Sequence, residues 1–332
     1  MRKLSISVLG DGGWGTTLAI LLNKKGFKVN LWGAFPSYSI YLNKKRVNSK
    51  FLPGIRIPND VSITSDLNDA ITGKDLIIFA IPSEYLRGVL KKIKQLDCPA
   101  GVKYLSVTKG IEISSLKRMS EVINDEIGNV DLAVLSGPTI AHEVAKCIPT
   151  TAVVASHDKE LRKFLQNILM TDFFRVYTND DLMGVELGGS LKNIIAIACG
   201  ISDGLGFGTN TKAALLSRGL VEMSRLGMAM GANPKTFYGL TGLGDLVTTC
   251  TSPYSRNRFV GEQIGKGGIF KQIKSRMQMV AEGVPTTKSA YALSLKYKVE
   301  MPITKEIYAV LYKNKSPKAA VRDLMTRQKK DE

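Results

Sequence analysis

The chain has 332 residues, 44% of them hydrophobic, which is enough to build two ordinary domain cores. Its apolar residues fall in runs shorter than the roughly 18 positions that a membrane span requires, so we expect no membrane span. The net charge of +17 is dispersed along the sequence without a basic stripe interleaved with aromatic residues, and we therefore expect no nucleic-acid partner.

Short β-branched runs alternate with helical stretches over the first 180 residues, a pattern that indicates βαβ units and a parallel sheet. Eight strands are expected, at Leu4–Leu9, Lys28–Trp32, Val61–Thr64, Asp75–Ala80, Tyr104–Thr108, Asp131–Leu135, Thr151–Ala155 and Phe173–Tyr177. From about residue 180 onward the strand signal ends and apolar positions recur at helical spacing. We therefore expect an α/β domain over residues 1–187 and an all-α domain over residues 188–332.

A glycine-rich turn, Gly10–Gly15, joins the first expected strand to the first helix. In this spacing Gly10 permits a tight turn, Gly12 lets the backbone approach a pyrophosphate, and Gly15 lets the helix pack closely on the strand. The free amides at the helix start then hold the anion. Because a strand precedes the motif and a helix follows it, we interpret it as a Rossmann-type dinucleotide site and not as a bare turn.

The acid that normally binds the adenosine ribose is missing after the second strand. The sequence reads Leu31-Trp32-Gly33-Ala34-Phe35 at this point, so no carboxylate repels a 2′-phosphate and no arginine at Ala34 attracts one. Both NAD and NADP are therefore allowed as cofactors.

Three loops follow strands of the expected sheet, where ligands of open α/β sheets bind. They contain Ile81-Pro82-Ser83, Lys109-Gly110 and Ser136-Gly137-Pro138-Thr139. Lys109 is the most informative of these residues, because a lysine between a strand end and a glycine can point toward a ligand. A lysine exposed on the surface explains the spacing equally well.

The long helix expected after Asp180-Asp181 carries Lys192 amid apolar neighbours, one turn after Gly188 and Gly189. Two glycines in a helix interior cost about 1 kcal/mol each, so they need a reason. Either a ligand approaches this bare patch, or another helix packs closely there.

A second glycine-rich run, Gly242–Gly244, leads into Asp245 and is followed by Ser255-Arg256-Asn257-Arg258 at an expected helix start. An arginine and free amides at a helix start can hold a phosphate monoester. The same residues are also typical of a capped turn. Further helices are expected at Thr211–Met230, Asn257–Lys266, Val284–Tyr297 and Lys305–Leu311.

Cysteine and histidine are scarce and scattered. The four cysteines, Cys98, Cys147, Cys199 and Cys250, never approach a CxxC spacing, and only two histidines are present. We therefore expect no metal, no disulfide framework and a reducing, cytoplasmic setting without a signal peptide. Acid–base chemistry then falls to lysine or carboxylate side chains.

Taken in order, these motifs resemble bacterial NAD(P)-dependent glycerol-3-phosphate dehydrogenase over nearly the whole chain. The matching segments are Gly10–Gly15, Lys50–Gly54, Thr108–Gly110, Leu135–Thr139, Gly189–Asn193, Gly242–Asp245, Ser255–Arg258 and Glu300–Ile303. Two positions depart from the family pattern. Gly13 stands where a serine is frequent, and Ala34 stands where a basic or imidazole side chain is common.

The resemblance implies interconversion of dihydroxyacetone phosphate and sn-glycerol 3-phosphate by hydride transfer, with NAD or NADP as cofactor. It further implies a cytoplasmic homodimer that supplies glycerol 3-phosphate for glycerophospholipid synthesis. Lys192 is the implied central catalytic residue, which stabilises and protonates the carbonyl oxygen, and Lys109 and Asp245 assist it.

The resemblance also assigns contacts along both domains. Cofactor contacts are implied at Gly10, Gly12, Gly13, Trp14, Gly15, Ala34, Lys109, Ala141, Arg256, Val280 and Glu282. Substrate contacts are implied at Lys109, Gly137, Thr139, Lys192, Asp245, Thr249, Ser255, Arg256 and Asn257.

Two other functions stay open on the residues alone. A related reductase of a keto acid would hold a carboxylate in place of the phosphate. A redox sensor that binds a dinucleotide and uses its positive surface on nucleic acid would bind cofactor without turnover. Lys109, Lys192 and Asp245 disfavour the sensor, because sensing requires none of them.

Overall fold

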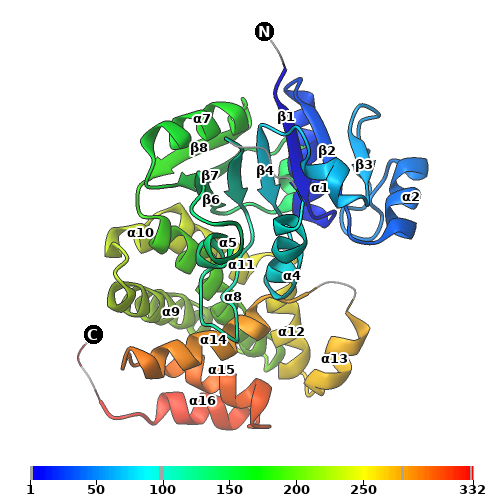
Figure 1. The fold of residues 1–332 in the computed structure, drawn as a ribbon. Coiled ribbons are helices and arrows are strands. Elements are labelled where there is room, and N and C mark those ends of the chain that lie inside the picture. Colours follow the sequence, from blue (N-terminus) through cyan, green and yellow to red (C-terminus); the bar gives the residue numbers. More distant parts are fainter. Residues whose placement is uncertain (1–2, 97–100, 278–279, 330, 332) are drawn as a thin grey trace. The chain divides into compact units, whose positions relative to one another are not determined.

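The computed structural model describes residues 3–96, 101–277, 280–329 and 331, so Cys98 lies outside the described residues. These residues form two compact units (Figure 1). The first unit contains residues 1–109 and 117–186, and the second contains residues 110–116 and 187–332, apart from the residues not described.

The first unit is built on one eight-stranded sheet in the order β3-β2-β1-β4-β5-β6-β7-β8. All eight expected strands are present within one or two residues: β1 Ser5–Leu9, β2 Lys28–Trp32, β3 Ser62–Thr64, β4 Leu76–Phe79, β5 Lys103–Ser106, β6 Leu132–Ser136, β7 Thr150–Ala155 and β8 Phe174–Asn179. The strand order reverses direction at β1 and β4, which are paired directly. Open α/β sheets bind ligands at such a switch point.

Helices cover both faces of this sheet, as the alternation of buried residues along each strand shows. Ile6 and Val8 of β1 belong to one core, whereas Leu9 belongs to the core on the opposite face. The helices of this unit are α1 Gly13–Lys24, α2 Pro36–Lys45, α3 Leu67–Ile71, α4 Ser83–Lys94, α5 Met119–Ile127, α6 Ala141–Ala145 and α7 Lys159–Leu169. Burial on both faces explains why a central strand such as β4 is apolar along its whole length.

The sheet is parallel, as expected, except at one pair, where β7 runs antiparallel to β6. The connection between them contains only the five-residue helix α6, which is about 7.5 Å long. A parallel crossover would have to return along a strand about 16 Å long. The short connection therefore leaves β7 to start from the edge where β6 ends, and β8 then pairs parallel to β7.

The second unit is helical throughout its described residues, as expected for an all-α domain. Its helices are α8 Leu182–Gly204, which begins in the first unit, α9 Thr209–Met230, α10 Pro234–Tyr238, the π-helix η1 Leu240–Gly244, α11 Asp245–Thr251, α12 Arg256–Gly265, α13 Phe270–Arg276, α14 Gly283–Lys296, α15 Pro302–Tyr312 and α16 Pro317–Met325. As expected, an aspartate caps the long helix, since the Asp181 carboxylate accepts a hydrogen bond from the amide of Gly184 at 2.9 Å.

The segment 110–116 packs with the second unit, although the expected boundary after residue 187 places it in the first domain. Its carbonyl groups explain the attachment. The hydroxyl of Ser190 donates to the carbonyl of Gly110 at 3.3 Å, and the hydroxyl of Ser289 donates to the carbonyl of Ile111 at 2.9 Å. Both hydroxyls belong to helices of the second unit.

Helices α8 and α12 approach each other backbone to backbone through small residues. A methyl group at Gly200 would lie 2.0 Å from the carbonyl oxygen of Arg258, and one at Gly261 would lie 2.1 Å from that of Ile197. Gly204 and Gly265, one helical turn further along each helix, are equally crowded. This contact packs α12, from Arg258 to Gly265, against the C-terminal part of α8.

Helix α8 is the one helix among the described residues that is long and apolar enough to cross a membrane. However, 89% of its most apolar 18-residue window is buried inside the protein. This burial is typical of the core helix of a folded domain.

Candidate active site

The glycine-rich turn of the first unit is closed on two sides. A methyl group at Gly15 would lie 1.9 Å from the carbonyl oxygen of Gly10, and one at Gly10 would lie 2.5 Å from the carbonyl oxygen of Ala80. Gly10 also has a φ of +123°, which other residues rarely adopt. Only glycine therefore permits this contact between β1, α1 and β4.

Gly12 differs from its neighbours because a methyl group there would meet nothing within 4 Å. It is the residue just before α1, and its side chain position faces open space at the helix start. The first amides of a helix have no partner within the helix, so they can donate to an anion at this point. The residues present thus fit a dinucleotide pyrophosphate.

Asn48, which no sequence motif indicated, supports this turn. The buried amide of Asn48 donates to the carbonyl of Asp11 and to the hydroxyl of Thr16, both at 2.8 Å. The carbonyl of Phe51 lies 2.6 Å from where a methyl group at Gly13 would be. The absence of the frequent serine at position 13 therefore has a packing reason. The Lys50–Gly54 motif, which contains Phe51, was the one sequence signal close to Asn48.

The other expected cofactor residues of the first unit, Ala141, Trp14 and Ala34, differ in how far they are from the glycine-rich turn and in how exposed they are. Ala141 starts α6, and its Cβ lies 3.8 Å from the methyl position of Gly13. Trp14 is half-buried and packs against the core, 6.3 Å from the ring of Phe174. Ala34 is exposed after β2.

Three expected substrate residues meet at the carboxyl ends of β5 and β6. The ammonium group of Lys109 donates to the carbonyl of Gly137 at 3.2 Å, and the hydroxyl of Thr139 donates to the same carbonyl at 3.2 Å. Gly137 has a φ of +132° and lies against the backbone of β7. The structure therefore brings this lysine, this glycine and this threonine together at one edge of the sheet.

Lys192 is buried in the second unit and carries two hydrogen-bond acceptors on its ammonium group. Asp245 accepts at 2.5 Å and the hydroxyl of Thr249 accepts at 2.6 Å. Lys192 is 6% exposed and Asp245 is 1% exposed. A buried charge pair of this kind is costly to assemble, and removing one partner from such a pair costs about 3–5 kcal/mol. The three residues expected from the sequence thus form one charged cluster.

The patch beside Gly188 is filled by protein. A methyl group at Gly188 would lie 2.5 Å from the carbonyl oxygen of Thr241, so close packing of α8 against η1 explains this glycine. The run Gly242–Gly244, interpreted as a possible capped turn, is instead the end of this π-helix. It continues into α11, and this places Asp245 at the first position of that helix.

The start of α12 collects the other expected substrate residues. Ser255 caps the helix, since its hydroxyl oxygen accepts from the amide of Arg258 at 3.2 Å. The buried side-chain amide of Asn257 donates to Asn193 at 2.8 Å, and its carbonyl accepts from the amide of Gly283 at 2.9 Å. Asn257 therefore joins α8, α12 and α14.

The two arginines of this motif have different surroundings. Arg258 forms an ion pair with Asp203 of α8 at 2.7 Å. Arg256 is an exposed residue, yet desolvation of its guanidinium lowers its pKa, and the Glu282 carboxylate opposes this effect. Arg256 and Glu282, two expected cofactor residues, are thus electrostatic neighbours, and Val280 lies two residues before Glu282.

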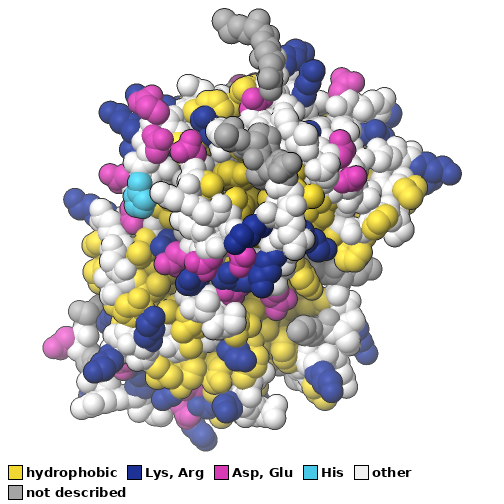
Figure 2. Space-filling view, in the orientation of Figure 1, with side chains coloured by type: hydrophobic (Ala, Val, Ile, Leu, Met, Phe, Trp, Pro, Cys, Tyr) yellow, Lys and Arg dark blue, Asp and Glu magenta, His cyan; other side chains and the backbone are white. Residues whose placement is uncertain are grey.

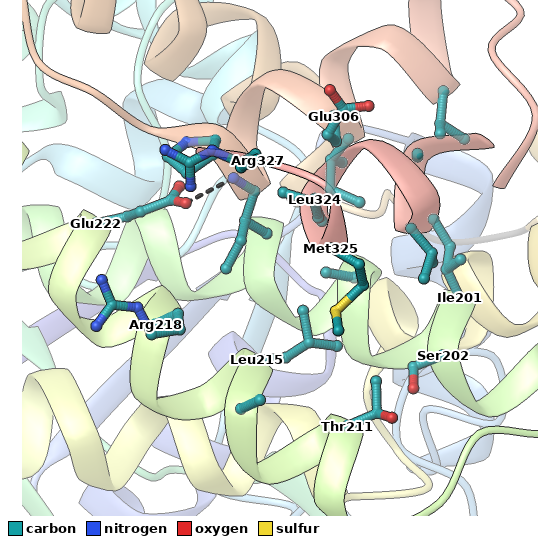
Figure 3. Close-up of a pocket in the computed structure, with 18 of the residues that line it drawn as sticks. Ile201, Ser202, Thr211, Leu215, Arg218, Glu222, Glu306, Leu324, Met325 and Arg327 are labelled. Carbon is teal, nitrogen blue, oxygen red and sulfur yellow. Dashed lines mark hydrogen bonds between the residues drawn. The ribbon is translucent and has the colours of Figure 1, made fainter. Parts of the chain in front are cut away.

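A cavity of about 320 Å³ lies elsewhere in the second unit, between α8, α9, α15 and α16 (Figure 3). Its lining contains none of the expected site residues. Figure 3 shows Met325 extending from α16 toward Leu215 across it. Glu222 lies at its wall and accepts from the amides of Ile303 and Thr304 at 2.6 and 3.1 Å. Burial raises the pKa of Glu222 to about 7, and these amides oppose the rise.

Basic side chains do not gather in one stripe on the face shown in Figure 2, where Lys and Arg lie among acidic and apolar side chains. Such a distribution differs from the continuous basic footprint of a nucleic-acid interface.

Both units match models of known families. A family model described as NAD-dependent glycerol-3-phosphate dehydrogenase N-terminus matches residues 5–162, and one described as NAD-dependent glycerol-3-phosphate dehydrogenase C-terminus matches residues 181–322.

Proteins of known name and structure resemble the chain over its whole length. It is 50% identical over 329 residues to a protein of Thermoanaerobacter sp. (strain X514) named glycerol-3-phosphate dehydrogenase (NAD(P)+), covering 99% of both chains. A protein of the same name from Prosthecochloris aestuarii is 49% identical over 330 residues, covering 98% of this chain and 99% of that protein. The crystal structure of glycerol-3-phosphate dehydrogenase from Coxiella burnetii matches with a TM-score of 0.95 and 40% identity, covering 98% of this chain and 99% of that one.

Proposed function

The chain belongs to the NAD-dependent glycerol-3-phosphate dehydrogenase family, and from this premise we propose that it interconverts dihydroxyacetone phosphate and sn-glycerol 3-phosphate with NAD or NADP as cofactor. The observation that supports the chemistry best is the buried cluster of Lys192, Asp245 and Thr249. A charged lysine that is held by a carboxylate and a hydroxyl can deliver a proton to a defined position.

The first unit is the proposed dinucleotide-binding domain. Gly12 and the first amides of α1 hold the pyrophosphate, and Gly10 and Gly15 shape the turn. Gly13, Trp14, Ala34, Lys109 and Ala141 are proposed as further cofactor contacts of this unit, with Arg256, Val280 and Glu282 contributing from the second. When bound, the reduced nicotinamide supplies the hydride.

Lys192 is the proposed catalytic residue. In the reduction, its ammonium group donates a hydrogen bond to the carbonyl oxygen of the substrate, stabilises the negative charge that develops there, and transfers a proton to it. Asp245 and Thr249 hold the ammonium group in one orientation by accepting from it at 2.5 and 2.6 Å. In the oxidation, the neutral amine takes the proton back from the alcohol.

The phosphate of the substrate is proposed to lie at the start of α12. Arg256 offers a planar pair of donors that suits a phosphate, and the helix start adds its positive dipole end. Ser255 and Asn257 shape this start by capping α12 and by joining it to α8 and α14. Lys109, Gly137 and Thr139 are the substrate contacts proposed for the first unit.

Several broader properties follow from family membership as proposals. We assign residues 1–187 to the dinucleotide domain and residues 188–332 to the substrate domain. We further propose a cytoplasmic homodimer, and that the glycerol 3-phosphate formed supplies glycerophospholipid synthesis.

The decisive experiment follows the oxidation of NADH and of NADPH by absorbance with dihydroxyacetone phosphate and, as a carboxylate comparator, ketopantoate. Turnover is expected with the phosphate substrate. Lys192→Ala is expected to lower kcat by about 10²-fold to 10⁴-fold, the usual contribution of acid–base catalysis, while cofactor binding is retained. Lys192→Gln keeps a hydrogen-bond donor for Asp245. It is expected to lose activity as Lys192→Ala does, but to be more stable than Lys192→Ala.

The matched control is Lys288→Ala, which removes an exposed lysine from α14 of the same unit and is expected to leave kcat unchanged. Wild-type rates in Lys192→Ala would remove Lys192 from the catalytic role. Turnover of ketopantoate without turnover of dihydroxyacetone phosphate would overturn the proposed substrate.

A further inference from the structure

The sequence lacks an acid at the end of β2, but the structure places a carboxylate there from another segment. Asp11, the second residue of the glycine-rich turn, lies against Gly33, the first residue after β2. A methyl group at Gly33 would lie 2.2 Å from Oδ2 of Asp11 and 2.7 Å from its Cγ. The Asp11 carboxylate thus occupies the space that a side chain at position 33 would fill.

Hydrogen bonds hold the turn against the end of β2. The amide of Gly10 donates to the carbonyl of Trp32, the last residue of β2, at 2.9 Å. On the other side, the amide of Asn48 holds the carbonyl of Asp11 at 2.8 Å. The position of Asp11 is therefore fixed by backbone contacts on both sides, and Gly12, which faces open space, follows it directly.

One oxygen of the Asp11 carboxylate receives no hydrogen bond from the described residues. This oxygen is Oδ2, and it is buried. Burial raises the pKa of Asp11, whereas a hydrogen bond from its own backbone amide and the positive charge of Lys50 lower it. A buried oxygen without a donor leaves the carboxylate under-solvated, so a ligand hydroxyl that donates to this half-buried carboxylate would be favourable.

We propose that Asp11 replaces the missing acid: its carboxylate accepts hydrogen bonds from the adenosine ribose hydroxyls and repels a 2′-phosphate, so the protein prefers NAD(H) to NADP(H). In a dinucleotide fold the acid with this task stands at the end of the second strand, beside the pyrophosphate turn. Asp11 meets both conditions, although it comes from the turn itself. This inference rests on the proposed dinucleotide site of the first unit.

Lys50 is the residue that favours the opposite preference, because a cation near this position could attract a 2′-phosphate. Its ammonium group lies 4.9 Å from the ring centre of Phe51 and 5.9 Å from that of Tyr38. The side chain is exposed, whereas Asp11 is half-buried with Oδ2 enclosed against Gly33. The enclosed carboxylate is therefore the better fixed of the two charges.

The test measures binding of NADH and NADPH by titration of their fluorescence, without substrate, and then kcat/KM for each. We expect the wild-type protein to bind NADH more tightly. Asp11→Asn keeps the size of the side chain but removes the charge, and it is expected to narrow the NADH-to-NADPH ratio of affinities by about tenfold or more, the usual effect of a hydrogen bond to a charged group.

Asp60→Asn is the matched control, because it removes the same charge from an exposed residue. Asp60 comes before β3, at the amino ends of the parallel strands, whereas Asp11 lies at their carboxyl ends. Asp60→Asn is expected to leave the ratio unchanged. Lys50→Ala tests the competing assignment, in which Lys50 attracts the 2′-phosphate. The role of Asp11 would be overturned if the wild-type protein prefers NADPH and Lys50→Ala lowers the affinity for NADPH without changing the affinity for NADH.

Failure of this inference is distinguishable from failure of the proposed function. If Asp11→Asn folds with an unchanged melting temperature and its ratio equals that of the wild type, the role of Asp11 is wrong while turnover stands. If neither cofactor binds to the wild-type protein, the dinucleotide site itself is wrong. Gly33→Ala provides a second route, because its methyl group must displace the Asp11 carboxylate and should shift the ratio in the same direction.

Discussion

The ligand sites proposed for the two units are built from different parts of the chain. In the first unit the site is made of backbone: Gly12 faces open space, and Gly10 and Gly15 bring β1, α1 and β4 into contact. In the second unit the site is made of side-chain charges, with Lys192 and Asp245 paired in the interior.

This difference sets how each unit responds to change. The backbone part of the first unit's site is sensitive to a single methyl group and insensitive to pH, since amides and carbonyls do not titrate. A site of buried charges tolerates small changes in shape better but depends on every charge having its partner. Substitutions that add a methyl group or remove a charge therefore test the comparison directly.

The largest effect on stability is expected from Gly15→Ala. Its methyl group would lie 1.9 Å from the carbonyl oxygen of Gly10 and 3.1 Å from the Cβ of Ala80, so β1 and α1 must move apart. Overpacking of this kind costs about 3 kcal/mol or more. Denaturant unfolding, together with NADH titration, should show loss of both stability and binding.

Gly12→Ala is the matched control, because its methyl group meets nothing within 4 Å and the backbone angles are accessible to alanine. Its unfolding midpoint is expected to equal that of the wild type, whereas its affinity for NADH should fall. If both variants lose stability equally, the distinction between an open and a closed glycine is wrong.

The sequence predicted the first unit well because its signals are local. Eight buried strands and the Gly10–Gly15 turn each lie within a short window, so periodicity and spacing reveal them. The antiparallel β7 was missed because strand direction depends on the length of the connection and not on the strand itself. Asn48 was missed because its partners, Asp11 and Thr16, lie more than 30 residues away.

The contacts of the second unit were harder to predict from the sequence, because they join residues of different helices. Gly200 and Gly204 are explained by the close backbone of Arg258 and Glu262 in α12, about 60 residues later, just as Gly261 and Gly265 are explained by the backbone of α8. Neither pair has a local signature, since isolated glycines in a helix predict little. Lys192 was found because a lysine amid apolar residues is unusual, yet its distance to Asp245 could come only from the structure.

A pH effect of intermediate size is expected from Glu222 in the second unit. Its pKa is about 7 in the folded protein, against 4.5 as the ordinary value, because burial disfavours the charged form. The folded state therefore binds a proton that the unfolded state has released between these pH values. The free energy of unfolding should fall by about 3 kcal/mol as pH rises from about 4.5 to above 7.

Denaturant unfolding at a series of pH values measures this slope. Glu222→Gln keeps an oxygen for the amide of Ile303 and should flatten the slope, since glutamine does not titrate. Glu84→Gln, at an exposed position of α4, should retain it. A slope that persists in Glu222→Gln would assign the titration to another group.

The smallest effects are expected from the two arginines at the start of α12. Because these arginines contact different groups, their substitution should change different quantities. Arg258→Ala breaks a partly buried ion pair with Asp203 and should cost about 1 kcal/mol of stability with an unchanged KM. Arg256→Ala should raise the KM for dihydroxyacetone phosphate about tenfold or more, because a charged donor to the phosphate is lost, while stability changes little. Steady-state kinetics and thermal unfolding of both variants are the measurements. An effect of Arg258→Ala on KM as large as that of Arg256→Ala would mean that the helix start, and not one guanidinium group, holds the phosphate.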